Sequence, residues 1–171
     1  MSDGTAIAPR LAGPKFMTLR ITASTPEETE TFGARLARVV PRHLTSALIV
    51  HLTGDLGAGK TTLARGFLKQ LGHEGTVKSP TYTLFETYEL RDLSVVHLDL
   101  YRLREPSELD ALGLRDMDRP RTVWLVEWPD RGAGRLPAAD LSIALEAGES
   151  AHVLTAVAHS KVGAAWLAEV G

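Results

Sequence analysis

GDLGAGKTT, at residues 54–62, is the stretch that decides the fold of this 171-residue chain. It matches the phosphate-binding pattern G-x-x-x-x-G-K-[ST] at every position, and Gly59, Lys60 and Thr61 are its last three residues. Glycine at positions such as Gly57 permits backbone angles closed to other residues, so successive N–H groups turn inward around an anion. In this pattern the lysine reaches the β/γ-phosphates and the threonine hydroxyl is placed to hold Mg²⁺. The stretch therefore predicts a nucleoside-triphosphate site.

The segments on either side of this loop have the character that such a site requires. An apolar, strand-like run precedes the loop at residues 47–52. An amphipathic run follows it, with Leu63, Phe67 and Leu71 at four-residue intervals, and Gly72 stops that run. A strand before and a helix after distinguish a phosphate-binding loop from a glycine-rich turn that fits the pattern by chance.

Composition is that of an ordinary globular protein, with 44% hydrophobic and 23% charged residues in a length typical of one domain. Lys and Arg total 19 against 21 Asp and Glu, so a broad electrostatic surface for nucleic acid is not indicated. The chain has no cysteine, which excludes disulfides, thiolate catalysis and cysteine-based metal sites. No apolar stretch approaches the length of a membrane span, and we expect a cytoplasmic protein.

The order of the expected elements predicts an α/β protein, a P-loop NTPase fold with a mixed central sheet flanked by helices. Strands are expected at residues 17–23, 47–52, 84–90, 95–100, 122–127, 140–146 and 151–158. Helical segments are expected between a Thr25 cap and Pro41, after the P-loop, at residues 105–114 and at residues 164–170. The strand at 122–127 is apolar at almost every position, which favours a buried central place in the sheet.

Three parts are expected along the chain. Residues 1–16 lack the apolar core of a signal peptide and are expected to form a flexible leader. Residues 17–158 are expected to form the P-loop ATPase domain. Residues 159–171 are expected to form a C-terminal helix that is packed on that domain or trails it.

Several polar residues outside the P-loop each allow two interpretations. Asp99 follows an apolar run and is either a carboxylate for Mg²⁺ or its water, or an ordinary strand-end aspartate. Glu127 ends the most apolar strand, where such sheets place ligands, or it is a capping carboxylate at a turn. Ser79 and Thr81 either contact a γ-phosphate or its metal, or belong to a plain proline turn. Trp128 is either a packing residue or a nucleotide contact.

The histidines and arginines outside the P-loop are weaker indications of a functional site. His51 and His97 lie within expected strands, and we expect them to be structural. Arg131 and Arg135 flank a glycine-rich segment, so they belong either to a phosphate-binding lid or to a solvated loop.

Taken together, four motifs resemble the bacterial TsaE (YjeE) family. They are GDLGAGKTT at residue 54, KSPTYTL at residue 78, HLDLYRL at residue 97 and VEWP at residue 126. The resemblance covers residues 17–157, and ordinary P-loop kinases lack the SPTY and EWP elements. The family implies a P-loop ATPase of the pathway that makes N6-threonylcarbamoyladenosine (t6A) at position 37 of tRNAs reading codons that begin with A.

The resemblance also implies roles for individual residues. Lys60, Asp99 and Glu127 are implied in catalysis, and Asp99 stands where the family has its Walker-B-like carboxylate. Thr61 and Glu127 are implied to hold Mg²⁺. Ser79 and Thr81 occupy a switch-like loop near the γ-phosphate. The implied ATP-binding residues are Gly54, Gly57, Ala58, Gly59, Lys60, Thr61, Thr62, Thr81 and Trp128.

The expected adenine position and the partners follow from the same resemblance. Adenine is expected near the start of the first helix, around Thr25 and Pro26. The implied partners are the carbamoyl-transferase subunit of the t6A complex and its paralogous scaffold subunit. The near-neutral charge agrees with a protein that meets tRNA only inside such a complex.

Three other functions compete with this ATPase. A small-molecule or nucleotide kinase needs a second substrate pocket and usually an arginine-bearing lid, which only Arg131 and Arg135 would supply. A GTP-binding switch usually has an N-K-x-D element, and the chain contains no asparagine, so adenine is favoured. A nucleotide-dependent adaptor with negligible turnover differs from the ATPase only in its rate.

Overall fold

The computed structural model of the protein describes residues 17–171, so the expected leader at residues 1–16 lies outside the described residues. Within the described part, seven strands form one sheet in the order β1-β7-β6-β2-β5-β4-β3. The strands are β1 (Thr18–Ala23), β2 (Leu48–Thr53), β3 (Phe85–Glu89), β4 (Ser94–Asp99), β5 (Thr122–Glu127), β6 (Leu141–Ala147) and β7 (His152–Ala158). Strands β6, β2, β5 and β4 are parallel to one another, and β1, β7 and β3 pair antiparallel with their neighbours. The predicted mixed α/β sheet is confirmed.

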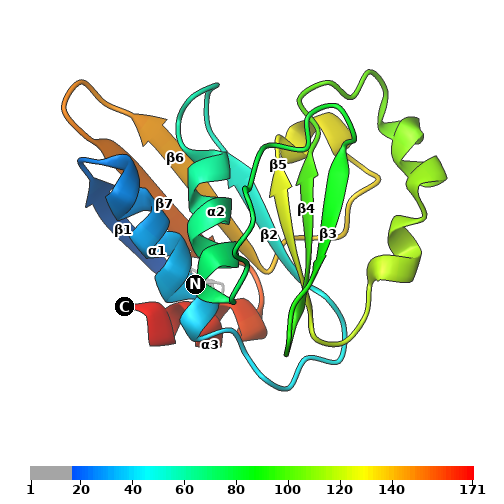
Figure 1. Cartoon of the computed structure of the whole chain (residues 1–171), viewed down its shortest axis with the longest axis horizontal. Coiled ribbons are helices and arrows are strands. Elements are labelled where there is room, and N and C mark those ends of the chain that lie inside the picture. The colour runs from blue at the N-terminus through cyan, green and yellow to red at the C-terminus, as the bar shows by residue number, and fades with distance from the viewer. Residues whose placement is uncertain (1–16) are drawn as a thin grey trace, which may run out of the picture.

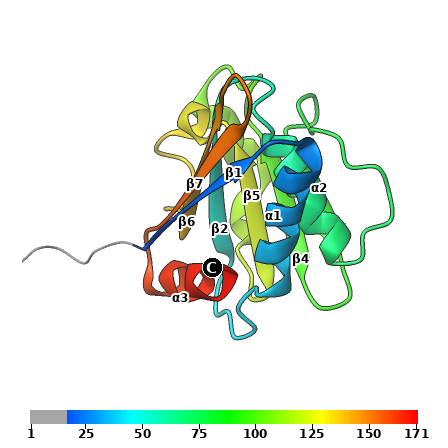
Figure 2. The same cartoon turned by 90° about the vertical axis from the view of Figure 1, so that its left-hand side faces the viewer.

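Helices lie on the sheet and at one end of it. They are α1 (Pro26–Arg38), α2 (Lys60–Gln70) and α3 (Lys161–Val170), with 3₁₀ helices η1 (Pro106–Leu112), η2 (Leu114–Met117) and η3 (Pro129–Gly132). Helices α1 and α2 lie side by side on one face of the sheet, and α3 lies at one end of it (Figure 1, Figure 2). Among the described residues, no helix combines the length and apolar character needed to cross a bilayer.

Helix α1 begins as its sequence predicts. The Thr25 hydroxyl accepts a hydrogen bond from the Glu28 N–H at 3.2 Å, and Pro26 occupies the first helical position. Phe32 and Leu36 are buried on the face that packs against the sheet and α2. The cap and the apolar stripe therefore fix where the helix starts and which face it buries.

Strand β5 is the centre of the core. All six of its residues are buried, as its apolar sequence predicts. Val123 and Leu125 belong to the cluster beneath α1 and α2, whereas Trp124 and Val126 belong to the cluster beneath η1. Side chains of a strand alternate between faces, so this one strand links both halves of the core.

The segment expected to be a helix at residues 105–114 differs from the prediction. It forms two 3₁₀ helices, η1 and η2, and the second extends to Met117. Gly113 separates them in the left-handed region at φ 66°, which a continuous right-handed helix does not allow. Leu109 and Leu114 are buried and anchor the two turns to the sheet. Local apolar spacing predicted a helical segment, but not its division.

Two glycines allow α1 and α2 to approach closely. A Cβ at Gly33 would lie 2.2 Å from the carbonyl oxygen of Leu63 on α2. A Cβ at Gly66 would lie 2.0 Å from the carbonyl oxygen of Glu30 on α1. Both distances are far below van der Waals contact, so the backbones of the two helices touch where neither glycine has a side chain.

Gly66→Ala should therefore destabilise the protein, although alanine is intrinsically the better helix former by about 1 kcal/mol. Forcing a methyl group between two backbones should cost about 1–3 kcal/mol in the free energy of unfolding, measured by urea denaturation. Gln70→Ala, an exposed substitution on the same helix, should change that free energy by less than about 0.5 kcal/mol. A Gly66→Ala protein as stable as the parent would contradict the close approach.

Candidate nucleotide-binding site

The P-loop joins β2 to α2 through glycines in conformations that other residues rarely adopt. Gly54, Gly57 and Gly59 have φ values of 143°, 81° and 105°. A Cβ at Gly54 would also lie 2.3 Å from the carbonyl oxygen of Leu145 on β6. Lys60, the first residue of α2, follows Gly59 directly, so the loop leads into the positive end of a helix.

The Lys60 ammonium group is held at the loop by its own backbone. Its Nζ donates to the carbonyl oxygens of Gly54 at 2.6 Å and Asp55 at 2.8 Å. It also lies 4.3 Å from the centre of the Trp128 ring. Burial lowers the pKa of Lys60 from its ordinary value, and nearby carboxylates, Glu127 first among them, oppose that shift. An ammonium group has three hydrogens, so one remains for an anion at the mouth of the loop.

Glu127 is contacted by side chains from two other elements, α2 and β4. Its Oε1 accepts a hydrogen bond from the Thr61 hydroxyl at 2.8 Å and lies 2.8 Å from Nε2 of His97. Glu127 and His97 are 2% and 0% exposed. The contact of His97 with a site carboxylate was not expected from the sequence. The signal was its two-residue spacing from Asp99, which places both side chains on one face of β4.

Asp99 holds the loop at residues 78–83, which we call the switch-like loop. Its Oδ2 accepts hydrogen bonds from the hydroxyl of Ser79 and, at 3.0 Å, from that of Thr81. The Thr81 and Ser79 hydroxyls are 2.5 Å apart. The other oxygen of Asp99 accepts from the Tyr101 N–H at 3.0 Å. Both oxygens of this buried carboxylate are therefore engaged within the protein.

Strand register brings these groups together. Asp99 on β4 lies opposite Glu127 on β5, and Leu52 on β2 also lies opposite Glu127. The carboxyl ends of three parallel strands therefore meet where the P-loop begins. A cavity of about 240 Å³ opens there. Its lining residues are Leu56, Gly57, Gly59, Lys60, Thr61, Thr62, Ser79, Thr81, Asp99, Tyr101, Glu127 and Trp128.

Most predicted site residues line this phosphate-side cavity, and two lie behind it. The carbonyl oxygen of Gly54 accepts a hydrogen bond from Lys60. Ala58 is buried, and its carbonyl oxygen accepts a hydrogen bond from Nδ1 of His152 at 2.9 Å. Leu56, Tyr101 and His152 were not expected at the site. Leu56 and Tyr101 lie within the GDLGAGKTT and HLDLYRL motifs, where no role was expected for them, and His152 lies in no motif and reaches the loop from β7.

A second cavity of about 130 Å³, which we call the base-side cavity, lies at the start of α1, where adenine was expected. Its lining residues are Ala23, Ser24, Thr25, Pro26, Thr29, Gly57, Gly59, Thr62 and His152. Gly57, Gly59 and Thr62 line both cavities, so the two meet at the P-loop. The first has converging charged groups, whereas the second is lined by no Asp, Glu, Lys or Arg.

The site offers oxygen donors that suit Mg²⁺ together with a nucleotide. Among the described residues, no group of three or more His, Cys, Asp or Glu side chains is arranged to hold a metal alone. Mg²⁺ is commonly held by one or two carboxylates together with substrate phosphates. Thr61 gives its hydrogen to Glu127, which leaves its oxygen lone pairs available to a cation. The donor set fits a metal that arrives with phosphates.

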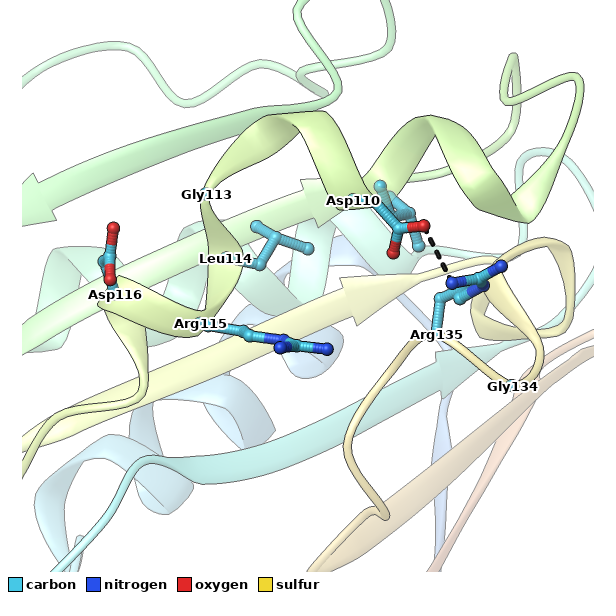
Figure 3. A pocket seen from close by; sticks show the side chains of 8 residues that line it. Asp110, Gly113, Leu114, Arg115, Asp116, Gly134 and Arg135 are labelled. Carbon is cyan, nitrogen blue, oxygen red and sulfur yellow. Dashed lines mark hydrogen bonds and ion pairs between the residues drawn. The ribbon is translucent and has the colours of Figure 1, made fainter.

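The arginines proposed for a lid are placed differently from one another. Arg135 pairs with Asp110 at 2.7 Å in a separate cavity of about 560 Å³, where Figure 3 shows the two side chains facing each other. That cavity shares no lining residue with the phosphate-side cavity. The Arg131 guanidinium lies 5.5 Å from the ring centre of Tyr101. Arg135 therefore lies apart from the phosphate site, and neither arginine lines it.

The sheet order and the loop define the class: this is an α/β protein with the P-loop NTPase fold. The model of the family described as "Threonylcarbamoyl adenosine biosynthesis protein TsaE" matches residues 23–154. The chain thus belongs to the TsaE family.

Individual relatives agree with this assignment. A Haemophilus influenzae protein named "tRNA threonylcarbamoyladenosine biosynthesis protein TsaE" is 43% identical over 133 residues, 77% of this chain and 84% of the relative. The Bacillus subtilis protein of the same name is 36% identical over 76% of this chain and 79% of its own length. The crystal structure of YdiB from Bacillus subtilis superimposes with a TM-score of 0.73 at 28% identity, covering 91% of this chain and 95% of that one.

Asp99→Ala should release the switch-like loop, because it removes the acceptor for both loop hydroxyls. A hydrogen bond to a charged group contributes about 1.5–3 kcal/mol, so the loop should open at least about tenfold more often. Native-state trypsin cleavage after the exposed Lys78, followed by mass spectrometry, measures that opening. Asp110→Ala removes the exposed ion pair with Arg135, away from this loop, and trypsin should cleave it at the parental rate. Equal cleavage of Asp99→Ala and the parent would show that the carboxylate does not hold the loop.

Proposed function

We propose that this protein is a Mg²⁺-dependent ATPase that supports formation of t6A at position 37 of tRNAs reading codons that begin with A. One observation supports the ATPase best: the partly buried hydrogen bond between Thr61 and Glu127 joins a hydroxyl and a carboxylate, both suitable Mg²⁺ ligands, close to the P-loop lysine. Relatives named as tRNA threonylcarbamoyladenosine biosynthesis proteins support the pathway.

The proposed roles follow the contacts. The P-loop N–H groups and Lys60 bind the phosphates, and Thr61 with Glu127 holds Mg²⁺. The metal, when bound, neutralises charge that develops on the phosphates. Asp99 keeps the switch-like loop beside the γ-phosphate position, so Ser79 and Thr81 exchange partners when a nucleotide binds. Trp128 packs against the Lys60 ammonium group.

ATP is proposed rather than GTP. The cavity at the start of α1 is lined mainly by small side chains and by His152. It carries no carboxylate among its lining residues to pair with the amino and imino groups of guanine. The chain also has no asparagine for the N-K-x-D element of common guanine sites.

Residues 17–158 are proposed to carry the activity, with the C-terminal helix as a support. In α3, Trp166 Nε1 donates to the carbonyl oxygen of Leu36 on α1 at 3.0 Å, and Trp166 is buried. The helix thereby holds the far end of α1, whose near end lines the base-side cavity.

The proposed partners are the carbamoyl-transferase subunit of the t6A complex and its paralogous scaffold subunit. Cytoplasmic tRNA would be met only through them, since 19 basic and 21 acidic residues leave the chain without the excess of positive charge that tRNA binding uses. Leu56 and Tyr82 are 73% and 85% exposed, and Leu56 lines the phosphate-side cavity.

Glu127→Gln tests the metal role with little change of side-chain shape. It should bind ATP in the absence of metal as the parent does, because Lys60 and the loop N–H groups remain. Its barrier to Mg²⁺-dependent hydrolysis should rise by about 3 kcal/mol, which lowers the turnover rate roughly a hundredfold. Lys60→Ala should instead lose both binding and turnover. Fluorescence titration and phosphate release measure the two properties. Parental turnover in Glu127→Gln would remove this residue from the mechanism.

Partner subunits should accelerate hydrolysis. Among the described residues, no arginine lines the phosphate-side cavity, and arginine fingers contribute about 10³–10⁵ to turnover in related chemistry. Phosphate release by the isolated protein should be slow and should rise when the two partner subunits are added. Lys60→Ala with the same subunits is the control for contaminating activity. Full turnover in isolation, unchanged by the subunits, would contradict partner dependence.

A further inference from the structure

His97 is a buried polar side chain that packing alone does not explain. It lies on β4 and is 0% exposed. Its neighbours on the same face of the strand are Val95, which belongs to the apolar core, and Asp99, which belongs to the site. Its ring meets one polar group, the carboxylate of Glu127, with 2.8 Å between Nε2 and Oε1. The histidine therefore lies directly behind the carboxylate that faces Thr61.

The direction of this hydrogen bond follows from its acceptor. An ionised carboxylate only accepts, so Nε2 of His97 carries the hydrogen. Nδ1 of the same ring is buried without a hydrogen-bond partner. A buried polar atom without a partner costs free energy, so the position would be better filled by an apolar residue if it served only the core. What this position gains is the N–H group aimed at Glu127.

Two donors converge on one oxygen of Glu127. His97 reaches it from β4 and Thr61 from α2, each at 2.8 Å. Together they fix the position of the carboxylate and its distance from the threonine oxygen. Without His97, a carboxylate on a strand end has several rotamers, and only some of them meet Thr61.

We propose that His97 is a positioning residue for the metal site: its Nε2–H holds the Glu127 carboxylate where Mg²⁺ and the nucleotide phosphates meet it. This inference rests on the proposed function and adds to it a residue that touches neither metal nor nucleotide. Hydrogen-bonding partners behind metal ligands contribute about 10–100-fold to metal affinity or activity in other proteins.

Three variants separate positioning from structure. His97→Leu removes the donor and keeps the position apolar. In His97→Gln the side-chain amide nitrogen stands where Nε2 stood, so the donor is retained. In His97→Asn the amide nitrogen corresponds to Nδ1 and falls short of Glu127. The contrast between the last two remains informative if His97→Leu does not fold.

His51→Leu is the matched control. His51 lies on the neighbouring strand β2 opposite Val126, so it projects from the other face of the sheet from Glu127. Its Nε2 is also buried without a partner. The control therefore removes a partly buried strand imidazole without touching a site carboxylate.

The test measures binding of Mn²⁺ to the protein–ADP complex by electron paramagnetic resonance, with ADP affinity measured separately in EDTA. His97→Leu and His97→Asn should bind Mn²⁺ about 10–100-fold more weakly, whereas metal-free ADP affinity should stay at the parental value. His97→Gln and His51→Leu should bind Mn²⁺ as the parent does. Thermal unfolding of each variant verifies that it is folded.

Two outcomes overturn the inference and differ from each other. If the parent binds Mn²⁺ with ADP and His97→Leu and His97→Asn bind it equally well, His97 does not position the site and the proposed function stands. If the parent itself binds no Mn²⁺ with ADP, the proposed function fails and this inference fails with it.

Discussion

The register between β4 and β5 is the constraint on which the rest of the site depends. Because these strands run parallel with Asp99 opposite Glu127, two carboxylates reach one edge of the sheet side by side. A slip of either strand by one residue would turn its carboxylate to the opposite face of the sheet and away from the P-loop. The apolar side chains that alternate with them fill two separate cores, so the register is held by burial on both faces. Packing far from the ligand thus determines the chemistry at the edge.

Local patterns in the sequence predicted what local forces determine. Residues 54–62, the Thr25 cap and the apolar run of β5 each act through neighbouring residues, and the structure has the loop, helix and strand that they indicate. The pairing of His97 with Glu127 spans 30 residues, and a lone histidine in an apolar strand has the same local pattern as a packing residue. The contact of His152 with the P-loop spans 94 residues. Only the sheet order brings such pairs together.

The charged groups of the site already have hydrogen-bond partners within the protein. Lys60 is bonded to two backbone carbonyls, Glu127 to two donors, and Asp99 to the switch-like loop and the backbone. A ligand therefore exchanges hydrogen bonds instead of meeting bare buried charges, whose desolvation would be costly. Trp128 completes the arrangement in the left-handed region at φ 57°, a conformation that costs about 1–3 kcal/mol. That strain turns the chain sharply after Glu127, and the indole lies over Lys60.

The contact between α1 and α2 through Gly33 and Gly66 has a consequence for the spacing of the two cavities. Residues at the start of α1 line the base-side cavity, and residues at the start of α2 line the phosphate-side cavity. With backbone against backbone, the two helices cannot move closer together. The helices therefore cannot bring the two cavities closer together, and any closure is left to other elements, such as the switch-like loop. The absence of two methyl groups thereby sets how closely the two cavities lie to each other.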